Sequence, residues 1–251
     1  MSRNVKPEGG FRTKAEQEVG KRIEEIFLKY PASVETKLEN FTKYVRRQKL
    51  TRLLAQYEIF KQVLDVKGSI IECGVYHGFG LMSWAQLSAV LEPVNLTRRI
   101  YGFDTFGGFP SVHEKDQSRF TQIDARVLSS DSYNELIELI KVYDSNRFLG
   151  HVSKVGLIKG DAVKTIPEFI QNNKHLVVSL LFLDFDLYEP TKAAIENFFP
   201  RMPKGAIIAF DELDNPLWPG ETLAILETIG INRLKIKRVE FDPYIGYAVI
   251  E

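Results

Sequence analysis

The sequence predicts an α/β protein built around an open, mostly parallel β-sheet. In residues 69–80 a short apolar run is followed by a glycine turn and then by an amphipathic segment, in which Leu81, Trp84 and Leu91 recur at helical spacing. Strand, glycine turn and helix in this order are how a parallel α/β sheet opens a ligand crevice at the carboxyl ends of its strands. Further apolar runs follow along the chain, separated by helical patterns, as expected for such a sheet.

The composition limits the class of protein. The chain has 251 residues, enough for one large domain with an extension. Lys and Arg together number 33, as do Asp and Glu, so the net charge is close to zero, and we expect neither nucleic acid nor a membrane as a partner. Cys73 is the only cysteine, and we expect it to pack in the core. A single cysteine, no apolar leader and no transmembrane run predict a cytoplasmic protein.

The predicted elements divide the chain into two parts. Residues 1–65 form a helical extension packed on the core, and residues 66–251 form the main domain. Within this domain the polar segment 111–131 is expected to be a lid or a disordered segment, because so long a loop in a compact domain is usually one of the two. Five parallel strands and a closing antiparallel hairpin are predicted at residues 69–72, 99–104, 155–159, 179–184 and 205–210, and at 234–241 with 244–250.

An acidic residue ends each of the five predicted parallel strands. The carboxyl ends of parallel strands share one edge of the sheet, so these acids should converge on the crevice, although each one alone could be a cap or turn residue. Asp104 stands where a carboxylate can accept the ribose hydroxyls of a nucleoside. Asp161 could accept a hydrogen bond from an adenine amino group or play a purely structural role. The full set is Glu72, Asp104, Asp161, Asp184 and the pair Asp211-Glu212.

The acids after the fourth and fifth parallel strands predict a cation site. The carboxylates of Asp184, Asp211 and Glu212 would repel one another at the ends of adjacent strands. A hard divalent cation bound through oxygen, such as Mg²⁺, relieves this repulsion. The alternative is that Asp184 or Asp186 caps the next helix and that Asp211 belongs to a turn.

Four motifs carry a resemblance to a known family. They are Glu72-Cys-Gly-Val-Tyr-His-Gly, Asp104-Thr-Phe-Gly-Gly-Phe-Pro110, Gly160-Asp161 and Leu183-Asp-Phe-Asp-Leu-Tyr-Glu-Pro-Thr191. Together they resemble the macrocin-type (TylF-like) O-methyltransferases, over residues from about 45 to 250. The resemblance implies a Rossmann-like class I methyltransferase, with a seven-stranded, mostly parallel sheet that closes in an antiparallel hairpin. It also implies an enzyme that uses S-adenosylmethionine and Mg²⁺ to methylate a sugar hydroxyl, often of a deoxysugar.

The resemblance also assigns roles to residues by position. Asp184, Asp211 and Glu212 match the family's Mg²⁺ ligands, and Asp184 is in addition a catalytic candidate. The family's best-known members have a histidine base in the lid, but residues 122–126 contain none here. His113, the only histidine of the loop, is therefore the candidate base, with Asp124 as an alternative. The expected cofactor-binding residues are Glu72, Gly74, Val75, Tyr76, Gly78, Asp104, Thr105, Phe106, Gly160, Asp161 and Ala162.

The predicted function is methyl transfer from S-adenosylmethionine to a small-molecule sugar or nucleotide-sugar, by a homo-oligomer. Trp218 could line the acceptor pocket or pack in the core. A nicotinamide-dependent reductase on the same fold is an alternative, but the glycine spacing differs from that of dinucleotide binders, and the acids of the cation site would have no role. A catechol-type O-methyltransferase is a further alternative, although no lysine closely follows Asp184. A non-catalytic interaction protein would not need the intact glycines and acids.

Overall fold

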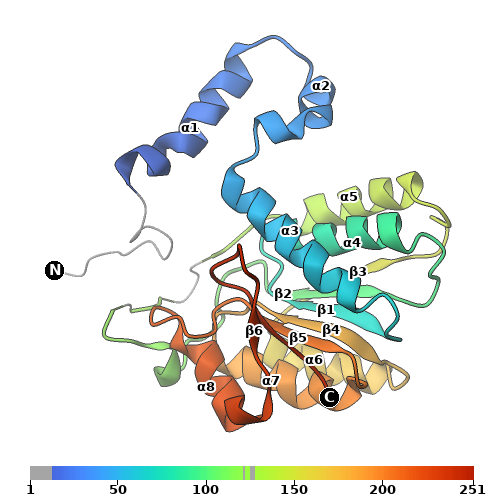
Figure 1. The fold of residues 1–251 in the computed structure, drawn as a ribbon, viewed down its shortest axis with the longest axis vertical. Helices are drawn as coiled ribbons and strands as arrows, with labels where there is room; N and C mark the ends of the chain where they lie inside the picture. The colour runs from blue at the N-terminus through green and yellow to red at the C-terminus, as the bar shows by residue number, and fades with distance from the viewer. Residues whose placement is uncertain (1–12, 121, 125–127) are drawn as a thin grey trace. The chain divides into compact units, whose positions relative to one another are not determined.

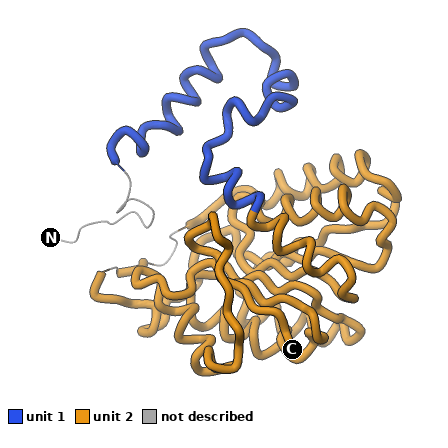
Figure 2. Tube along the Cα trace, viewed as in Figure 1, with its two compact units in different colours: residues 1–54 blue, residues 55–251 orange. Residues whose placement is uncertain are grey.

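The structure is a computed structural model that describes residues 13–120, 122–124 and 128–251. The chain divides into two compact units, residues 1–54 and 55–251, shown in two colours in Figure 2. The helix α3 (Arg47–Gln62) runs across this division, and its second half belongs to the second unit. The predicted boundary after residue 65 falls beyond the end of this helix. Four positions of the predicted lid, 121 and 125–127, lie outside the described residues.

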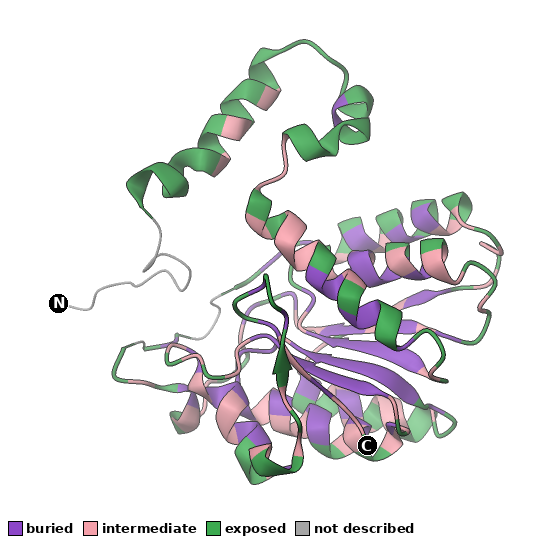
Figure 3. Cartoon of the chain, in the orientation of Figure 1, coloured by how far each residue is buried: buried purple, intermediate pink, exposed green. Residues whose placement is uncertain are grey.

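The first unit consists of short helices with little buried surface. They are α1 (Lys14–Lys29), α2 (Val34–Glu39), the 3-10 helix η1 (Phe41–Lys43) and the start of α3. A capping box begins α1, because the Thr13 hydroxyl accepts the Glu16 N–H and the Glu16 carboxylate accepts the Thr13 N–H. Lys37 connects α2 to α1 by donating to the carbonyl of Phe27. No described residue of α1 is buried (Figure 3).

In the second unit, seven strands of the described residues form one sheet in the order β3-β2-β1-β4-β5-β7-β6 (Figure 1). The strands from β3 to β5 pair in parallel, whereas β7 pairs antiparallel with both β5 and β6. Their bounds are β1 (Ser69–Cys73), β2 (Ile100–Asp104), β3 (Val155–Lys159), β4 (Val178–Leu183), β5 (Ile207–Phe210), β6 (Lys237–Arg238) and β7 (Gly246–Val249). The predicted seven-stranded, mostly parallel sheet with an antiparallel end is confirmed.

The closing hairpin is shorter than predicted. The sequence predicts a strand over residues 234–241, but only the two residues of β6 pair with β7. Asp242 explains the early end, because its Oδ1 accepts the N–H groups of Tyr244 at 2.9 Å and of Ile245 at 3.1 Å. Such a side-chain turn gives the backbone an alternative to the strand ladder.

Helices cover both faces of the sheet (Figure 1). One face packs against the second half of α3, α4 (Phe79–Leu91) and α5 (Tyr133–Asn146), and the other against α6 (Ala162–Asn172), α7 (Tyr188–Phe198) and α8 (Pro219–Glu227). Every residue of β4 is buried (Figure 3), as expected for a strand covered on both faces. None of the described helices combines the length and the apolar character needed to cross a bilayer.

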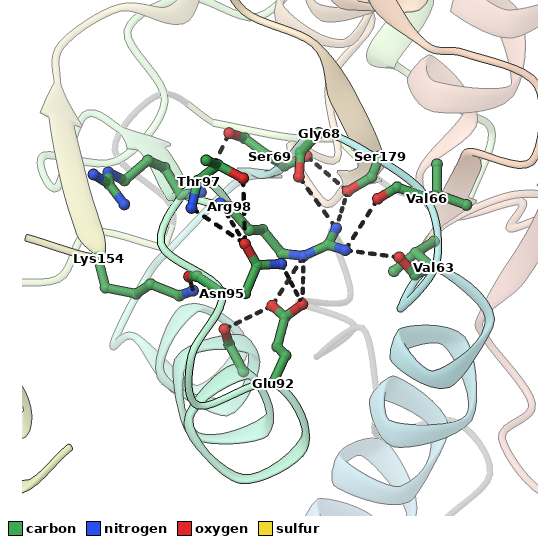
Figure 4. Close-up of polar contacts among 12 residues, drawn as sticks. Val63, Val66, Gly68, Ser69, Glu92, Asn95, Thr97, Arg98, Lys154 and Ser179 are labelled. Carbon is green, nitrogen blue, oxygen red and sulfur yellow. Dashed lines mark hydrogen bonds and ion pairs between the residues drawn. The ribbon is translucent and has the colours of Figure 1, made fainter. Parts of the chain in front are cut away.

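A buried arginine fixes the amino-terminal edge of the sheet. Arg98 is 2% exposed and precedes β2 (Figure 4). Its guanidinium forms an ion pair with Glu92 at 2.9 Å, so the buried charge is compensated. It also donates to acceptors on separate segments, namely the carbonyl oxygens of Val63, Val66 and Gly68 and the hydroxyl of Ser179. The glycine turn and the acids that follow the parallel strands lie at the opposite, carboxyl edge of the sheet.

Candidate active site

The turn between β1 and α4 lies where the strand order reverses between β1 and β4, the usual place of a ligand crevice in such sheets. Gly74 has a φ of 101°, and a Cβ there would lie 2.0 Å from the carbonyl oxygen of Asp184. Gly78 has a φ of 85°, and a Cβ there would lie 2.3 Å from Leu136 Cδ2. Gly74 requires glycine because a side chain would force the backbone of Asp184 away, and Gly78 requires it because of its left-handed φ.

Non-glycine residues with left-handed backbone conformations gather at the same edge. Of the six such residues that the structure describes, four follow β1, β2, β4 and β5 and have φ values from 52° to 64°, namely Tyr76, Phe106, Asp186 and Asp214. The other two are Leu128 and Leu149. Such conformations cost on the order of 1–3 kcal/mol each and cluster at functional sites. The hydroxyls of Ser130 and Ser132 support the first of them by donating to the Tyr76 carbonyl at 2.9 and 2.6 Å. This strain points to the carboxyl edge as the functional region.

Asp104 binds loop backbone in this structure. Its Oδ2 accepts the N–H groups of Val75 and Tyr76, both at 2.8 Å, and its Oδ1 accepts the N–H of Phe106 at 2.6 Å. Asp104 thus joins the glycine turn after β1 to the loop after β2. These bonds use three of the about four acceptor positions of a carboxylate. One acceptor position is left for a ribose hydroxyl, and a second hydroxyl would have to share or replace one of the three bonds. The contact from Asp104 to a ribose stays a prediction.

Glu72 is a buried residue of β1 whose side chain reaches the start of α4. It is 2% exposed, and a Cβ on Gly80 would lie 2.0 Å from Glu72 Oε1. The Glu72 carboxylate thus lies beside the first turn of α4, where the positive end of the helix dipole favours a negative charge. The neighbouring Cys73 is fully buried, as predicted. Burial raises the pKa of its thiol well above the ordinary value, and the nearby acidic charges raise this pKa further.

Asp161 follows β3 and caps a helix. Its Oδ1 accepts the N–H of Val163 at 3.2 Å in the first turn of α6, which begins at Ala162. The preceding Gly160 has a φ of 143° and donates its N–H to the Asp104 carbonyl at 2.9 Å. The structural role of Asp161, one of its two predicted alternatives, is therefore observed. Its contact to an adenine stays a prediction.

The predicted cation ligands come from neighbouring strands. In the parallel pair of β4 and β5, Leu183 lies opposite Phe210, and the N–H of Asp211 donates to the Leu183 carbonyl at 3.0 Å. Asp184 and Asp211 are the next residues of the two strands, so the fold brings them to the same edge. Glu212 follows directly, and its carboxylate accepts the side-chain amide of Asn215.

Two further carboxylates belong to this group, and neither is among the site residues that the sequence predicts. Asp186 is 8% exposed and Glu221 is fully buried. Burial raises the pKa of both carboxyl groups well above the ordinary value, and the charges of Asp211 and Glu212 raise it further. In the sequence, Pro219 at the start of a helical pattern was the available signal for the helix that carries Glu221.

The acids share an edge without forming a complete metal site. In the part of the chain that the structure describes, no three His, Cys, Asp or Glu side chains are placed to hold one metal ion together. Mg²⁺ binding by Asp184, Asp211 and Glu212 therefore stays a prediction. What the structure does show is crowded negative charge at the end of β5 and the start of α8.

His113 is packed against α7. It begins the 3-10 helix η2 (Glu114–Asp116), and its Nδ1 accepts the N–H of Lys115 at 3.1 Å. Its Nε2 lies 3.7 Å from a carboxylate oxygen of Glu189, and its ring centroid lies 5.1 Å from that of Tyr188. One ring nitrogen thus caps η2 while the other faces an acid. The role of His113 as the base stays a prediction.

Polar contacts fasten the first part of the lid to α7 and α8. Asp116 is 1% exposed, and its carboxylate accepts the N–H groups of Tyr188 at 2.7 Å and of His113 at 2.8 Å. The ammonium of Lys115 donates to the Tyr188 hydroxyl at 3.0 Å and pairs with Glu227 at 2.6 Å. These contacts join η2 to the start of α7 and the end of α8.

A small apolar cluster fastens the next part of the lid. Ile123, Leu187 and Trp218 are buried together, and Phe109 packs edge-on against Trp218 with ring centroids 6.0 Å apart. The side chain of Gln117 bonds to both the N–H and the carbonyl of Ile123. Trp218 is therefore a packing residue, but it packs under the lid and outside the two main cores.

A surface cavity of about 540 Å³ lies elsewhere in this unit. It is lined by parts of α7, α8 and the chain end, including Phe199 and Val249. Because Val249 pairs with Ile207 at the start of β5, this cavity lies toward the amino edge of the sheet. We therefore assign the site from the backbone and the acids at the carboxyl edge.

Known proteins match this fold and this set of motifs. The sequence profile of the macrocin-O-methyltransferase family (TylF) matches residues 41–226. A crystal structure of CalS11, a calicheamicin methyltransferase, is 36% identical, covers 95% of this chain and 93% of its own, and has a TM-score of 0.90. An apo structure of CalS11, described as a TDP-rhamnose 3'-O-methyltransferase, is 35% identical, covers 95% of each chain and has a TM-score of 0.83. The O-methyltransferase NovP shares the fold at 18% identity, with a TM-score of 0.63 over 93% of this chain and 97% of its own. A comparison with curated proteins gives no match.

Proposed function

Since the chain belongs to the macrocin-O-methyltransferase (TylF) family, and is thereby an S-adenosylmethionine-dependent O-methyltransferase, we propose that its acceptor is a hydroxyl of a nucleotide-linked deoxysugar. The observation that carries this proposal is the 36% identity over 95% of the chain to CalS11. That protein is described as a TDP-rhamnose 3'-O-methyltransferase. The acidic edge supports the proposal, because a sugar hydroxyl is a weak acid and needs a group that takes its proton.

The residues at the glycine turn fit the cofactor. Gly74 and Gly78 let this turn adopt left-handed φ values and pack closely against the Asp184 carbonyl and Leu136. The turn lies where the strand order reverses, which is the usual place of a bound ligand in such sheets. We assign Glu72 and the turn to the methionine end of the cofactor, Asp104 to the ribose and Asp161 to the adenine. When bound, S-adenosylmethionine supplies a methyl group that its sulfonium already activates. The protein then has to align the acceptor oxygen, an orientation effect that can contribute several kcal/mol.

We also assign Mg²⁺ to Asp184, Asp211 and Glu212. The donors are all carboxylate oxygens, the kind of ligand that this hard cation prefers. Burial raises the pKa of the neighbouring Asp186 and Glu221, and the charges of Asp211 and Glu212 raise it further. This second contribution supports the assignment, because a cation relieves such a crowding of negative charge. When bound, Mg²⁺ lowers the pKa of a coordinated hydroxyl.

Asp184 is the proposed acceptor of the hydroxyl proton. It is partly exposed and stands at the end of β4, beside the glycine turn. His113 is the second candidate, but its Nδ1 already accepts the Lys115 N–H, which leaves only Nε2 for this role. The lid, fastened to α7 and α8, is proposed to keep water from the acceptor.

Methylation of TDP-rhamnose and other TDP-deoxysugars tests the proposal. With S-adenosylmethionine and Mg²⁺, mass spectrometry should detect a product heavier by one methylene group, together with S-adenosylhomocysteine. If no TDP-deoxysugar is methylated, the proposed acceptor is wrong. Turnover that persists in excess EDTA would remove only Mg²⁺ from the proposal. Thermal stabilisation by NADPH and not by S-adenosylhomocysteine would instead favour the reductase.

We also propose a cellular location and an oligomeric state. The enzyme is assigned to the cytoplasm, which fits a single, fully buried thiol. It is assigned to a homo-oligomer because helices of the first unit carry exposed apolar side chains, among them Leu28 and Leu38. Light scattering on the eluting protein tests the second assignment, and a monomeric mass would contradict it.

A further inference from the structure

Glu221 is a buried carboxylate that the assigned roles do not use. It lies in the first turn of α8, and none of its surface is exposed. Its Oε1 accepts the N–H of Glu212 at 3.0 Å. Its Oε2 is also buried and has no hydrogen-bond partner among the residues that the structure describes. Folded proteins rarely leave a buried polar atom without a partner, and a bound ion or water is a common reason for one.

The surroundings of this side chain are acidic. Glu221 interacts with the charges that end β5 and with one that follows β4, namely those of Asp211, Glu212 and Asp186. It also acts on Cys73, at the end of β1, together with Glu72 and Asp184. The bond from the Glu212 N–H, at 3.0 Å, places the Glu221 carboxylate just after the end of β5, beside the proposed cation ligands Asp211 and Glu212.

A glycine in α8 lets this helix pack closely against the lid and the start of α7. A Cβ on Gly220 would lie 2.1 Å from Asp116 Oδ1 and 2.6 Å from the backbone nitrogen of Tyr188. Only glycine permits this approach, because any side chain would push α8 away from α7 and from the lid. The next residue in α8 is Glu221, so the close approach places its carboxylate at the acidic edge.

We infer that Glu221 is a fourth carboxylate of the cation site. Its Oε1 positions the backbone of Glu212. Its Oε2 binds the cation directly or accepts a hydrogen bond from a water molecule that the cation retains. Mg²⁺ keeps several waters in protein sites, so an oxygen next to the ligands still contributes to binding. The inference rests on the Mg²⁺ of the proposed function and adds a residue from α8 to the ligands from β4 and β5.

The substitution Glu221→Gln distinguishes the roles of the two carboxylate oxygens. Only the amide oxygen of glutamine can accept the Glu212 N–H, so the NH₂ group must take the place of Oε2. An NH₂ group donates hydrogen bonds and cannot bind a cation. A matched control is Glu227→Gln, on the same helix, where the carboxylate pairs with Lys115 at the lid.

The test is a calorimetric titration of the full chain with MnCl₂ and, in parallel, MgCl₂. We expect Glu221→Gln to weaken both affinities by about tenfold or more, as outer residues of metal sites do. Glu227→Gln should bind both ions like the wild type. In EDTA, Glu221→Gln should unfold at a temperature no lower than the wild type, because the bond to Glu212 is kept.

The outcomes distinguish a failure of the role inferred for Glu221 from a failure of the proposed Mg²⁺ site. Equal Mn²⁺ affinity in the wild type and in Glu221→Gln overturns the inference and leaves the proposed Mg²⁺ in place. A wild type that binds neither ion overturns both. If Glu221→Gln does not fold in EDTA, Glu221→Met, with an apolar side chain of similar size, replaces it in the titration. Wild-type affinity in that variant also overturns the inference.

Discussion

Replacing Asp116 with alanine should loosen the attachment of the lid to α7. The Asp116 carboxylate accepts two backbone N–H groups, from Tyr188 at 2.7 Å and from His113 at 2.8 Å. Hydrogen bonds to a charged group contribute roughly 1.5–3 kcal/mol each. Burial raises the pKa of Asp116 and so opposes its charged form, while the two N–H groups lower this pKa. We therefore take the lower limit for both bonds and expect a loss of about 3 kcal/mol.

Hydrogen exchange measures this loss directly. A change of about 3 kcal/mol corresponds to roughly hundredfold faster exchange in η2 and at the amide of Tyr188. The control is Glu114→Ala, which removes an exposed acid from the same short helix and should leave exchange unchanged. Wild-type exchange in Asp116→Ala, or equal acceleration in the control, would refute the proposed anchoring.

Two other predictions concern the cofactor turn and the core. Gly74→Ala should weaken S-adenosylhomocysteine binding by at least about tenfold, because the added Cβ would lie 2.0 Å from the Asp184 carbonyl oxygen and displace the turn. Calorimetry measures this affinity, and an unchanged value would exclude the turn from the cofactor site. Burial lowers the pKa of Lys154 from 10.5 to about 8, so between these values the unfolded chain holds a proton that the folded chain has lost. Stability should therefore rise with pH across that window by up to about 3 kcal/mol. In Lys154→Met this rise in the free energy of unfolding should be absent. Urea unfolding at several pH values measures it, and an equal pH dependence in the variant and the wild type would contradict the prediction.

The sheet could be predicted because the apolar pattern of its strands is visible in short stretches of the sequence. Strands covered on both faces must be apolar along their whole length, and this is visible in the sequence of β4 and β5. The shared edge of Asp184 and Asp211 follows from parallel pairing alone. The length of β6 could not be predicted in the same way, because the turn at Asp242 ends the strand through side-chain hydrogen bonds.

The site was only partly predictable, because several of its contacts join distant segments. Nothing in the local sequence of Glu221 shows that α8 will bring it to the ends of β4 and β5. The serines that hold the Tyr76 carbonyl are more than fifty residues away from it in the chain. Asp104 was predicted from its place after a strand, but its bonds to the glycine turn depend on how the two loops fold together.

The most direct test of the account compares two properties of Asp211→Ala, its turnover and its affinity for S-adenosylhomocysteine. Asp211 follows β5, whereas the cofactor turn follows β1, and β4 lies between these strands. The account therefore predicts that the variant, like the wild type in excess EDTA, loses turnover with a TDP-deoxysugar but binds S-adenosylhomocysteine as before. Full turnover in the variant, or loss of cofactor binding together with turnover, would contradict the division of this edge into a cofactor half and a cation half.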